Sequence, residues 1–423
     1  MKRVTLLIIL LALVACTQNT ERPSPNTMLE QQTVVQSANK AQPNEPSDSK
    51  QPLFQPEQRI IPTQRTLAQE WSSGRCEGSG AVNLSSPINP EQLELIAPYG
   101  LMIDAHVTPI DHQYWSPKGE FMNAPPTQVL APADGFVVSM QHMVQFVGDK
   151  DFESKVDDYR LVLEHSCTLY TYFIHIGKLS EKIMNEFNKQ RRGALYANLR
   201  VPVKRGEILG FITKPVDFAV VDTTKELTGF IKPEHYNAEP WKINTVDPFD
   251  YFTEPVRSQL LSRNPRSTQP LGGKIDHDQQ GFLIGNWFAI GTNGYGGLKQ
   301  EEYWREHLAF APDVYDLTQF VVSLGSFKGK AKQFGIKEGI SPALVNTDSG
   351  IVKYSLAEYS YTANGKPWSH QKYEGPVKAT ITDSPVQATL LVQVTGTNSI
   401  KAEIFTKQPE EVTGFENPIE FER

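Results

Sequence analysis

The sequence predicts a mainly β protein, with a helical insertion in its first folded part and a second antiparallel β region behind it. Short runs rich in β-branched and aromatic residues, separated by turns containing Gly, Pro or Asp, recur from about residue 67 onward. One stretch, 178–191, instead repeats its apolar residues at helical spacing. With 423 residues, 39% of them hydrophobic, the chain is long enough for about two to three domains.

The first 16 residues have the pattern of a secretory signal. Lys2 and Arg3 precede the apolar run VTLLIILLALVAC, which is too short to span a bilayer comfortably. The run ends in Leu13–Cys16 (LVAC), which resembles the lipobox of bacterial lipoproteins and implies acylation of Cys16. Acyl chains would anchor the mature chain to a membrane. Because Thr17 is not Asp, resemblance to bacterial sorting signals implies the outer membrane, facing the periplasm; an uncleaved anchor helix or a plain signal peptide are the alternatives.

Residues 17–66 are predicted to be a disordered tether. They are rich in Gln, Asn, Pro and Ser and contain few large apolar residues. Such a segment buries too little apolar surface to offset its ordering entropy.

Two cysteines remain in the mature chain, Cys76 and Cys167. In an exported protein an even pair favours a disulfide over a metal site, and neither cysteine lies in a C-x-x-C spacing. Two buried free thiols are the alternative.

The first folded domain is expected over residues 67–255. Its predicted strands lie in QVLAPADGFVVSM, YRLVLEHSC, LYTYFIHIG, VPVKRGEILGFI and VDFAVVD, the first broken by the turn signal Ala-Asp-Gly. The helix is expected in KLSEKIMNEFNKQR, between the third and fourth of these segments.

Four of these segments resemble the lysostaphin/LytM family of zinc endopeptidases that cleave peptidoglycan. TQVLAPADGFVV, LEHSCTLYTYFIHIGKLS, VPVKRGEILGFI and VDFAVVD follow the family's order, and His165 and His175 keep its ten-residue separation. The resemblance covers about 150 residues. It implies a small open barrel, the duplicated hybrid motif, with a groove across the sheet, but such a fold does not by itself establish hydrolysis.

The family's active-site pattern is only partly kept. His175 matches a catalytic histidine, whereas Pro215 and Asp217 stand where the two histidines of an H-x-H motif would be. In HVTPIDHQYW the first histidine, His106, is followed by Asp111 after five residues, where the family has four.

Strand alternation leaves two candidate metal sites open. In a strand, His106 and His112 would share a face, and Asp111 would point away unless Pro109 bends the chain. The sites are therefore His106, Asp111 and Asp217, or His106, His112 and Asp217, and zinc is the metal that the resemblance implies. The other interpretation is a hydrogen-bonded polar cluster.

Residues 256–273 are expected to be a linker, and residues 274–423 a second β domain. The Pro- and Gly-containing segment LSRNPRSTQPLGG supports the linker. Alternating runs broken at Asp-Ser-Pro and Gly-Thr-Asn predict antiparallel hairpins, in a barrel or a sandwich.

These observations favour an envelope lipoprotein that binds or scaffolds at the cell wall without efficient turnover. The partner would be peptidoglycan or an envelope protein. The alternative is a metal-dependent endopeptidase acting on peptidoglycan, in which His175 orients water or stabilises the oxyanion. A net charge of −7 argues against nucleic-acid binding. No Walker loop, G-x-G-x-x-G or G-x-S-x-G motif supports nucleotide binding or serine-hydrolase chemistry.

Overall fold

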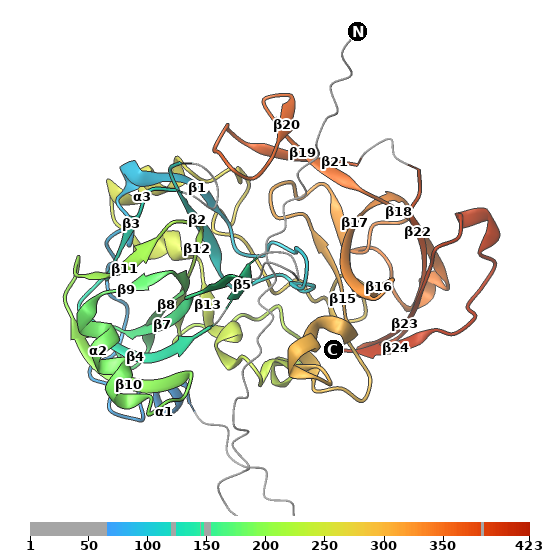
Figure 1. Cartoon of the computed structure of the whole chain (residues 1–423). Helices are drawn as coiled ribbons and strands as arrows, with labels where there is room; N and C mark the ends of the chain where they lie inside the picture. The colour runs from blue at the N-terminus through green and yellow to red at the C-terminus, as the bar shows by residue number, and fades with distance from the viewer. Residues whose placement is uncertain (1–65, 120–123, 144, 148–153, 382–384) are drawn as a thin grey trace, which may run out of the picture.

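The computed structural model describes residues 66–119, 124–143, 145–147, 154–381 and 385–423. Cys16 and nearly all of the expected tether therefore lie outside the described residues. Two β domains stand side by side (Figure 1), which confirms the predicted fold class. Within the described part of the chain, no helix is long and apolar enough to cross a membrane.

The first domain is built on a large antiparallel sheet. Its strand order is β1-β2-β12-β8-β7-β4-β10, with β13 paired to β12. The strands are β1 (Leu93–Ala97), β2 (Gln113–Pro117), β4 (Gly135–His142), β7 (Tyr159–Glu164), β8 (Leu169–Ile176), β10 (Tyr196–Val203), β12 (Val216–Asp222) and β13 (Thr245–Val246). A smaller sheet contains β3 (Thr127–Leu130), β11 (Ile208–Ile212) and β9 (Lys178–Leu179), and β5 (Gln145–Val147) pairs with β6 (Ser154–Val156). Strands β3, β4, β7, β8, β10, β11 and β12 lie in or overlap the five segments that the sequence predicted, whereas β1, β2, β5, β6, β9 and β13 lie outside those segments.

The main core of this domain lies between the large sheet and the smaller sheet with its helix. Phe173 and Phe218 of the large sheet belong to the same buried cluster as Leu209 of β11. The predicted helix is α2 (Glu181–Gln190), and its Ile183 and Phe187, four residues apart, join that cluster. The opposite face of the sheet is covered by α1 (Leu67–Trp71) and by 3₁₀ turns of the later chain.

Short helices lie in the first domain and in the connection to the second. The first domain has the 3₁₀ turns η2 (Pro90–Gln92), η3 (Pro233–Tyr236), η4 (Pro240–Asn244) and η5 (Pro248–Tyr251). Residues 256–273 begin with α3 (Val256–Leu261), and Asn264 and Arg266 behind it are buried. This connection is thus packed against the rest of the protein.

Cys76 and Cys167 form a disulfide across 91 residues of sequence, with their Cα atoms 5.0 Å apart. It ties the segment after α1 to the turn between β7 and β8. Ser166 Oγ donates to the carbonyl of Gly80 at 3.0 Å in the same place. The bond therefore fixes the start of the described chain to the large sheet.

The second domain is a closed barrel of eight strands. They are β14 (Gly285–Ala289), β15 (His307–Pro312), β16 (Phe320–Phe327), β17 (Lys330–Glu338), β18 (Val352–Ala357), β22 (Ala388–Gly396), β23 (Ser399–Phe405) and β24 (Ile419–Glu422). Pairing of Phe288 with Glu422 closes the barrel and leaves no free edge. The barrel also carries a three-stranded sheet, β20 (Lys366–Trp368), β19 (Tyr359–Ala363) and β21 (Val377–Ile381), and the turns η6 (Gly294–Gly296), η7 (Gln300–Glu306), η8 (Thr347–Ser349) and η9 (Pro409–Glu411).

The two domains share buried apolar clusters. Leu101 and Ile110 of the first domain pack in one cluster with Trp368 of the second. Met102 packs with Ala309 of β15 in another. The loop between β1 and β2, which contains the stretch HVTPIDH, is therefore held between the two domains.

Candidate functional site

The stretch HVTPIDHQYW is a loop that enters a strand, and the expected strand conformation of His106–His112 is wrong. Strand β2 begins only at Gln113. Backbone hydrogen bonds from Gly100 N to Ile110 O (2.7 Å) and from Ile110 N to Leu101 O (3.3 Å) fold the loop back on itself. Strand alternation consequently does not apply to Asp111 and His112. Asp111 Oδ1 lies 3.6 Å from His112 Nδ1, so the two side chains lie side by side.

Strand β12 brings Asp217 to this loop, because β12 lies between β2 and β8. Asp217 is opposite Tyr114 of β2 and Ile174 of β8. Its Oδ2 atom lies 3.2 Å from His112 Nε2 and 3.5 Å from His175 Nε2. Three of the predicted site residues therefore meet around one carboxylate oxygen. Burial raises the pKa of Asp217, and the two imidazoles offset part of that effect.

The carboxylate of Asp111 is fully engaged by neighbouring donors. Lys242 Nζ lies 2.6 Å from Oδ1, while Tyr172 Oη and Trp241 Nε1 donate to Oδ2 at 2.7 and 2.9 Å. Burial alone would raise the pKa of Asp111, but Lys242 together with His112 holds it well below the ordinary value. Asp111 is thus an ionised carboxylate within the protein interior, paired with an internal cation.

Lys242 is the cation of this cluster, and it is 3% exposed. Besides Asp111 it contacts Glu239 at 3.1 Å, and its ammonium lies 4.5 Å from the ring centroid of Tyr295. Burial would lower the pKa of Lys242, but the Asp111 and Glu239 carboxylates raise it above the ordinary value. Because Tyr295 belongs to the second domain, that domain covers the ammonium of a first-domain lysine.

His175 is oriented by a second buried carboxylate. Its Nδ1 atom lies 2.7 Å from Asp158 Oδ2, which Lys214 Nζ also contacts at 3.1 Å. Its backbone φ is +76°, an uncommon conformation for a residue with a side chain. A histidine held through Nδ1 by a carboxylate is positioned for proton transfer at Nε2, but here Nε2 faces Asp217.

His106 lies at the edge of the cluster, beside His112. The two rings are 5.7 Å apart between centroids and nearly perpendicular. Burial lowers the pKa of His106 to about 3, with smaller contributions from His112 and Lys242. The imidazole is therefore neutral at physiological pH.

The residues as arranged do not fit a zinc centre. In the described ranges, no group of three or more His, Cys, Asp or Glu side chains could hold a metal ion. Asp111, a member of one expected site, already accepts from three donors, one of them a cation. The distances from Asp217 to His112 and His175 do match the roughly 3.3 Å between ligands of a tetrahedral zinc with bonds of about 2.0–2.1 Å. However, a dication there would stand in the same buried cluster as the Lys242 ammonium.

Sequence reasoning missed the residues that contact and orient the cluster: Lys242, Trp241, Tyr172, Asp158 and Lys214. Tyr172 and Asp158 lie on or beside predicted strands, where they resemble ordinary strand residues. Lys242 and Trp241 come from η4, more than 100 residues after Asp111 in the chain. No local pattern links them to the motif.

His165, the other histidine of the resemblance, is a hydrogen-bonded residue at the end of β7. Its ring nitrogens lie 3.0 Å from the carbonyl oxygen of Asp134 and 2.9 Å from Thr171 Oγ1. His165 follows the last residue of β7, at the end of the strand remote from His175, and it takes no part in the cluster.

Comparisons with known proteins include a distant structural likeness. No protein-family model matches the chain, and no curated protein matches it. A zinc-containing peptidase from Vibrio cholerae is similar at a TM-score of 0.16 and 16% identity, over 35% of this chain. This chain spans 36% of that peptidase chain. A likeness at this level carries no argument about activity, so membership of the lysostaphin/LytM family stays a prediction.

Proposed function

We propose that this chain is a non-catalytic binding or scaffold protein of the bacterial envelope, with a first domain of the lysostaphin type. The contact between Lys242 Nζ and Asp111 Oδ1 at 2.6 Å carries the proposal. A lysine ammonium supplies the positive charge that this group of acidic and histidine side chains needs. The Asp111 carboxylate is therefore paired with a cation of the protein itself, as a structural ion pair.

The burial of the cluster supports the same conclusion. Asp111, His112 and Asp217 are 3%, 5% and 2% exposed. A hydrolytic centre needs an open position where water and the scissile bond can meet its reactive groups. Here the second domain packs over Lys242 through Tyr295. Binding would therefore use surfaces outside the cluster.

The envelope location in this proposal rests on the N-terminal sequence. Acylation of Cys16 would anchor the chain to the outer membrane, and residues 17–66 would give the folded part reach into the periplasm. Peptidoglycan, or a protein attached to it, is then the partner within reach.

The test uses the full chain with Cys16→Ser, which keeps both domains and removes the lipid anchor. We expect no stoichiometric zinc uptake in competition with a chromophoric chelator. We also expect the protein to co-sediment with purified peptidoglycan and to release no soluble fragments. Stoichiometric zinc uptake together with fragment release contradicts the proposal, and failure to co-sediment removes peptidoglycan as the partner.

A metal-dependent endopeptidase is the second candidate, and the spacing of His112, Asp217 and His175 favours it. It requires a rearrangement that moves Lys242 away from the cluster. If the protein is such an enzyme, fragment release should be abolished in His175→Ala. It should remain in His142→Ala, a matched control whose ring contacts Asp157, outside the cluster. Equal release by both variants would exclude the cluster as its origin.

A further inference from the structure

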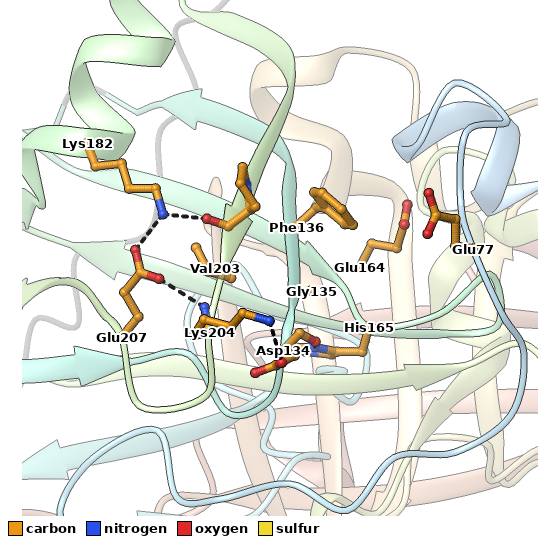
Figure 2. Close-up of a pocket in the computed structure, with 11 residues that line it drawn as sticks. Glu77, Asp134, Gly135, Phe136, Glu164, His165, Lys182, Val203, Lys204 and Glu207 are labelled. Atoms are coloured by element: carbon orange, nitrogen blue, oxygen red, sulfur yellow. Dashed lines mark hydrogen bonds and ion pairs between the residues drawn. The ribbon is translucent and has the colours of Figure 1, made fainter.

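A separate cavity of about 510 Å³ lies at the other end of β7 from the His–Asp cluster. Asp158, which orients His175, immediately precedes β7, and Glu164, which lines the cavity, ends it. Figure 2 shows the cavity between the start of β4, the end of β10 and the segment that carries Glu77. It is therefore independent of the cluster on which the proposed function rests.

One wall of the cavity is electrically neutral because its charges are paired. Lys182 Nζ lies 2.7 Å from Glu207 Oε1, and Lys204 Nζ lies 2.9 Å from Asp134 Oδ2 (Figure 2). His165 adds no charge near neutral pH, because burial lowers its pKa to about 4. This wall leaves no charge for a ligand to neutralise.

The opposite wall carries an excess negative charge. Glu77 and Glu164 share one cation, Arg200, at distances of 3.7 and 3.4 Å. The Arg200 guanidinium is also held over the ring of Phe136, 3.8 Å from its centroid. On this wall two carboxylates therefore share one contacting cation.

Glu164 is the buried member of this pair of carboxylates. This residue is 2% exposed, and among the described residues its Oε2 atom has no hydrogen-bond partner. A buried carboxylate oxygen without a donor is costly, by about 1–3 kcal/mol or more for a charged group. Glu164 and Glu77 both contact Arg200, and Figure 2 shows both side chains on the same side of the cavity as Phe136. A cationic group placed between them would satisfy both carboxylates.

We propose that this cavity binds an organic ligand that carries a primary ammonium group on an apolar stem. The ammonium would donate to Glu164 and Glu77, and the stem would lie against Phe136, Pro202 and Val203. An ammonium has three donors and can therefore donate to two carboxylates at once. A lysine side chain of a peptide has this chemistry.

The experiment titrates the full chain, as Cys16→Ser, with Nα-acetyl-lysine methylamide and with its neutral counterpart, Nα-acetyl-norleucine methylamide. Saturable binding of the lysine compound by calorimetry, and none of the norleucine compound, is expected. Glu164→Gln should weaken binding about tenfold or more, the loss expected for one charge-assisted hydrogen bond. Glu186→Gln, on α2 and outside the cavity lining, should bind like the parent chain.

Equal binding of both compounds, no saturable binding, or full binding by Glu164→Gln would overturn the proposal. Calcium or sodium chloride that binds tightly and displaces the lysine compound would also overturn it, in favour of an inorganic cation. If Glu164→Gln does not fold, Glu77→Gln decides the matter, because the Glu77 side chain is 84% exposed and its substitution leaves the core intact. None of these outcomes depends on the state of the Asp111 cluster.

Discussion

Replacing Lys242 with Met removes the cation of the buried cluster while nearly preserving the volume of the side chain. Asp111 then loses its 2.6 Å ion pair and keeps the neutral donors Tyr172 and Trp241, with His112 Nδ1 at 3.6 Å. Breaking a buried pair from one side leaves an uncompensated charge, which typically costs about 3–5 kcal/mol. We expect the free energy of unfolding to fall by about that amount at pH 7.

The loss should depend on pH in a defined direction. In the parent chain the pKa of Asp111 lies well below the ordinary value, so its stabilisation is present above pH ~3.9 and is lost as pH falls through the lower folded pKa. Without Lys242, burial raises the pKa of Asp111 and the folded variant takes up a proton more readily. The destabilisation should therefore be largest near pH 7 and smaller near pH 4.

Denaturant unfolding, followed by tryptophan fluorescence at both pH values, measures these differences. Lys189→Met is the matched control, since this exposed lysine contacts Glu186 at 3.4 Å on the surface of α2. It should change stability by less than about 0.5 kcal/mol. The double variant Asp111→Asn with Lys242→Met should recover part of the loss. A loss for Lys242→Met below about 1 kcal/mol, or an equal loss at both pH values, would refute the reasoning.

Three further predictions concern other parts of the chain. Cys167→Ser opens the 91-residue loop closed by the bond to Cys76 and should lower stability by about 4 kcal/mol; an unchanged denaturation midpoint would contradict this. Burial lowers the pKa of His307 to about 3, so the unfolded chain binds a proton below pH ~6.5 that the folded chain does not. Stability should thus decrease as pH is lowered from about 6.5 towards 3. His307→Phe should reduce the slope of stability against pH by about 1.4 kcal/mol per pH unit. Parallel curves for the parent chain and the variant would show that this histidine does not contribute. Cys16→Ser should move the protein from the membrane fraction to the soluble fraction, and unchanged partition would remove the lipid anchor.

Much of the fold could be predicted because its signals are local. Enrichment in β-branched and aromatic residues in YRLVLE and LYTYFIHI indicates strands, and the spacing of Ile183 and Phe187 indicates α2. Whether the second domain is a barrel or a sandwich remained open in the sequence. That choice depends on the pairing of β14 with β24, which are separated by more than 120 residues. No residue pattern within either strand specifies this partner.

The candidate site shows the same division. The resemblance to the lysostaphin/LytM family was the basis for expecting Asp217 and His175 near the HVTPIDH loop. The role of Asp111 could not be predicted, because Lys242 reaches it from η4, remote in sequence. In the sequence, Glu164 resembled an ordinary residue at a strand end. It became a candidate ligand-binding residue only when the structure showed it buried, with no hydrogen-bond donor to Oε2 among the described residues. Long-range packing, absent from any local motif, decides both cases.

The position of the β1–β2 loop between the two domains affects how the protein can be divided. Leu101, Met102 and Ile110 are buried in clusters shared with the second domain. A fragment that ends after α3 would expose these side chains to water and lose the packing that holds the loop. Such a fragment would be prone to aggregate, and zinc or peptidoglycan measurements made on it would describe a loop released from its native constraint. The two domains are thus one unit for biochemistry, although their strands form separate sheets.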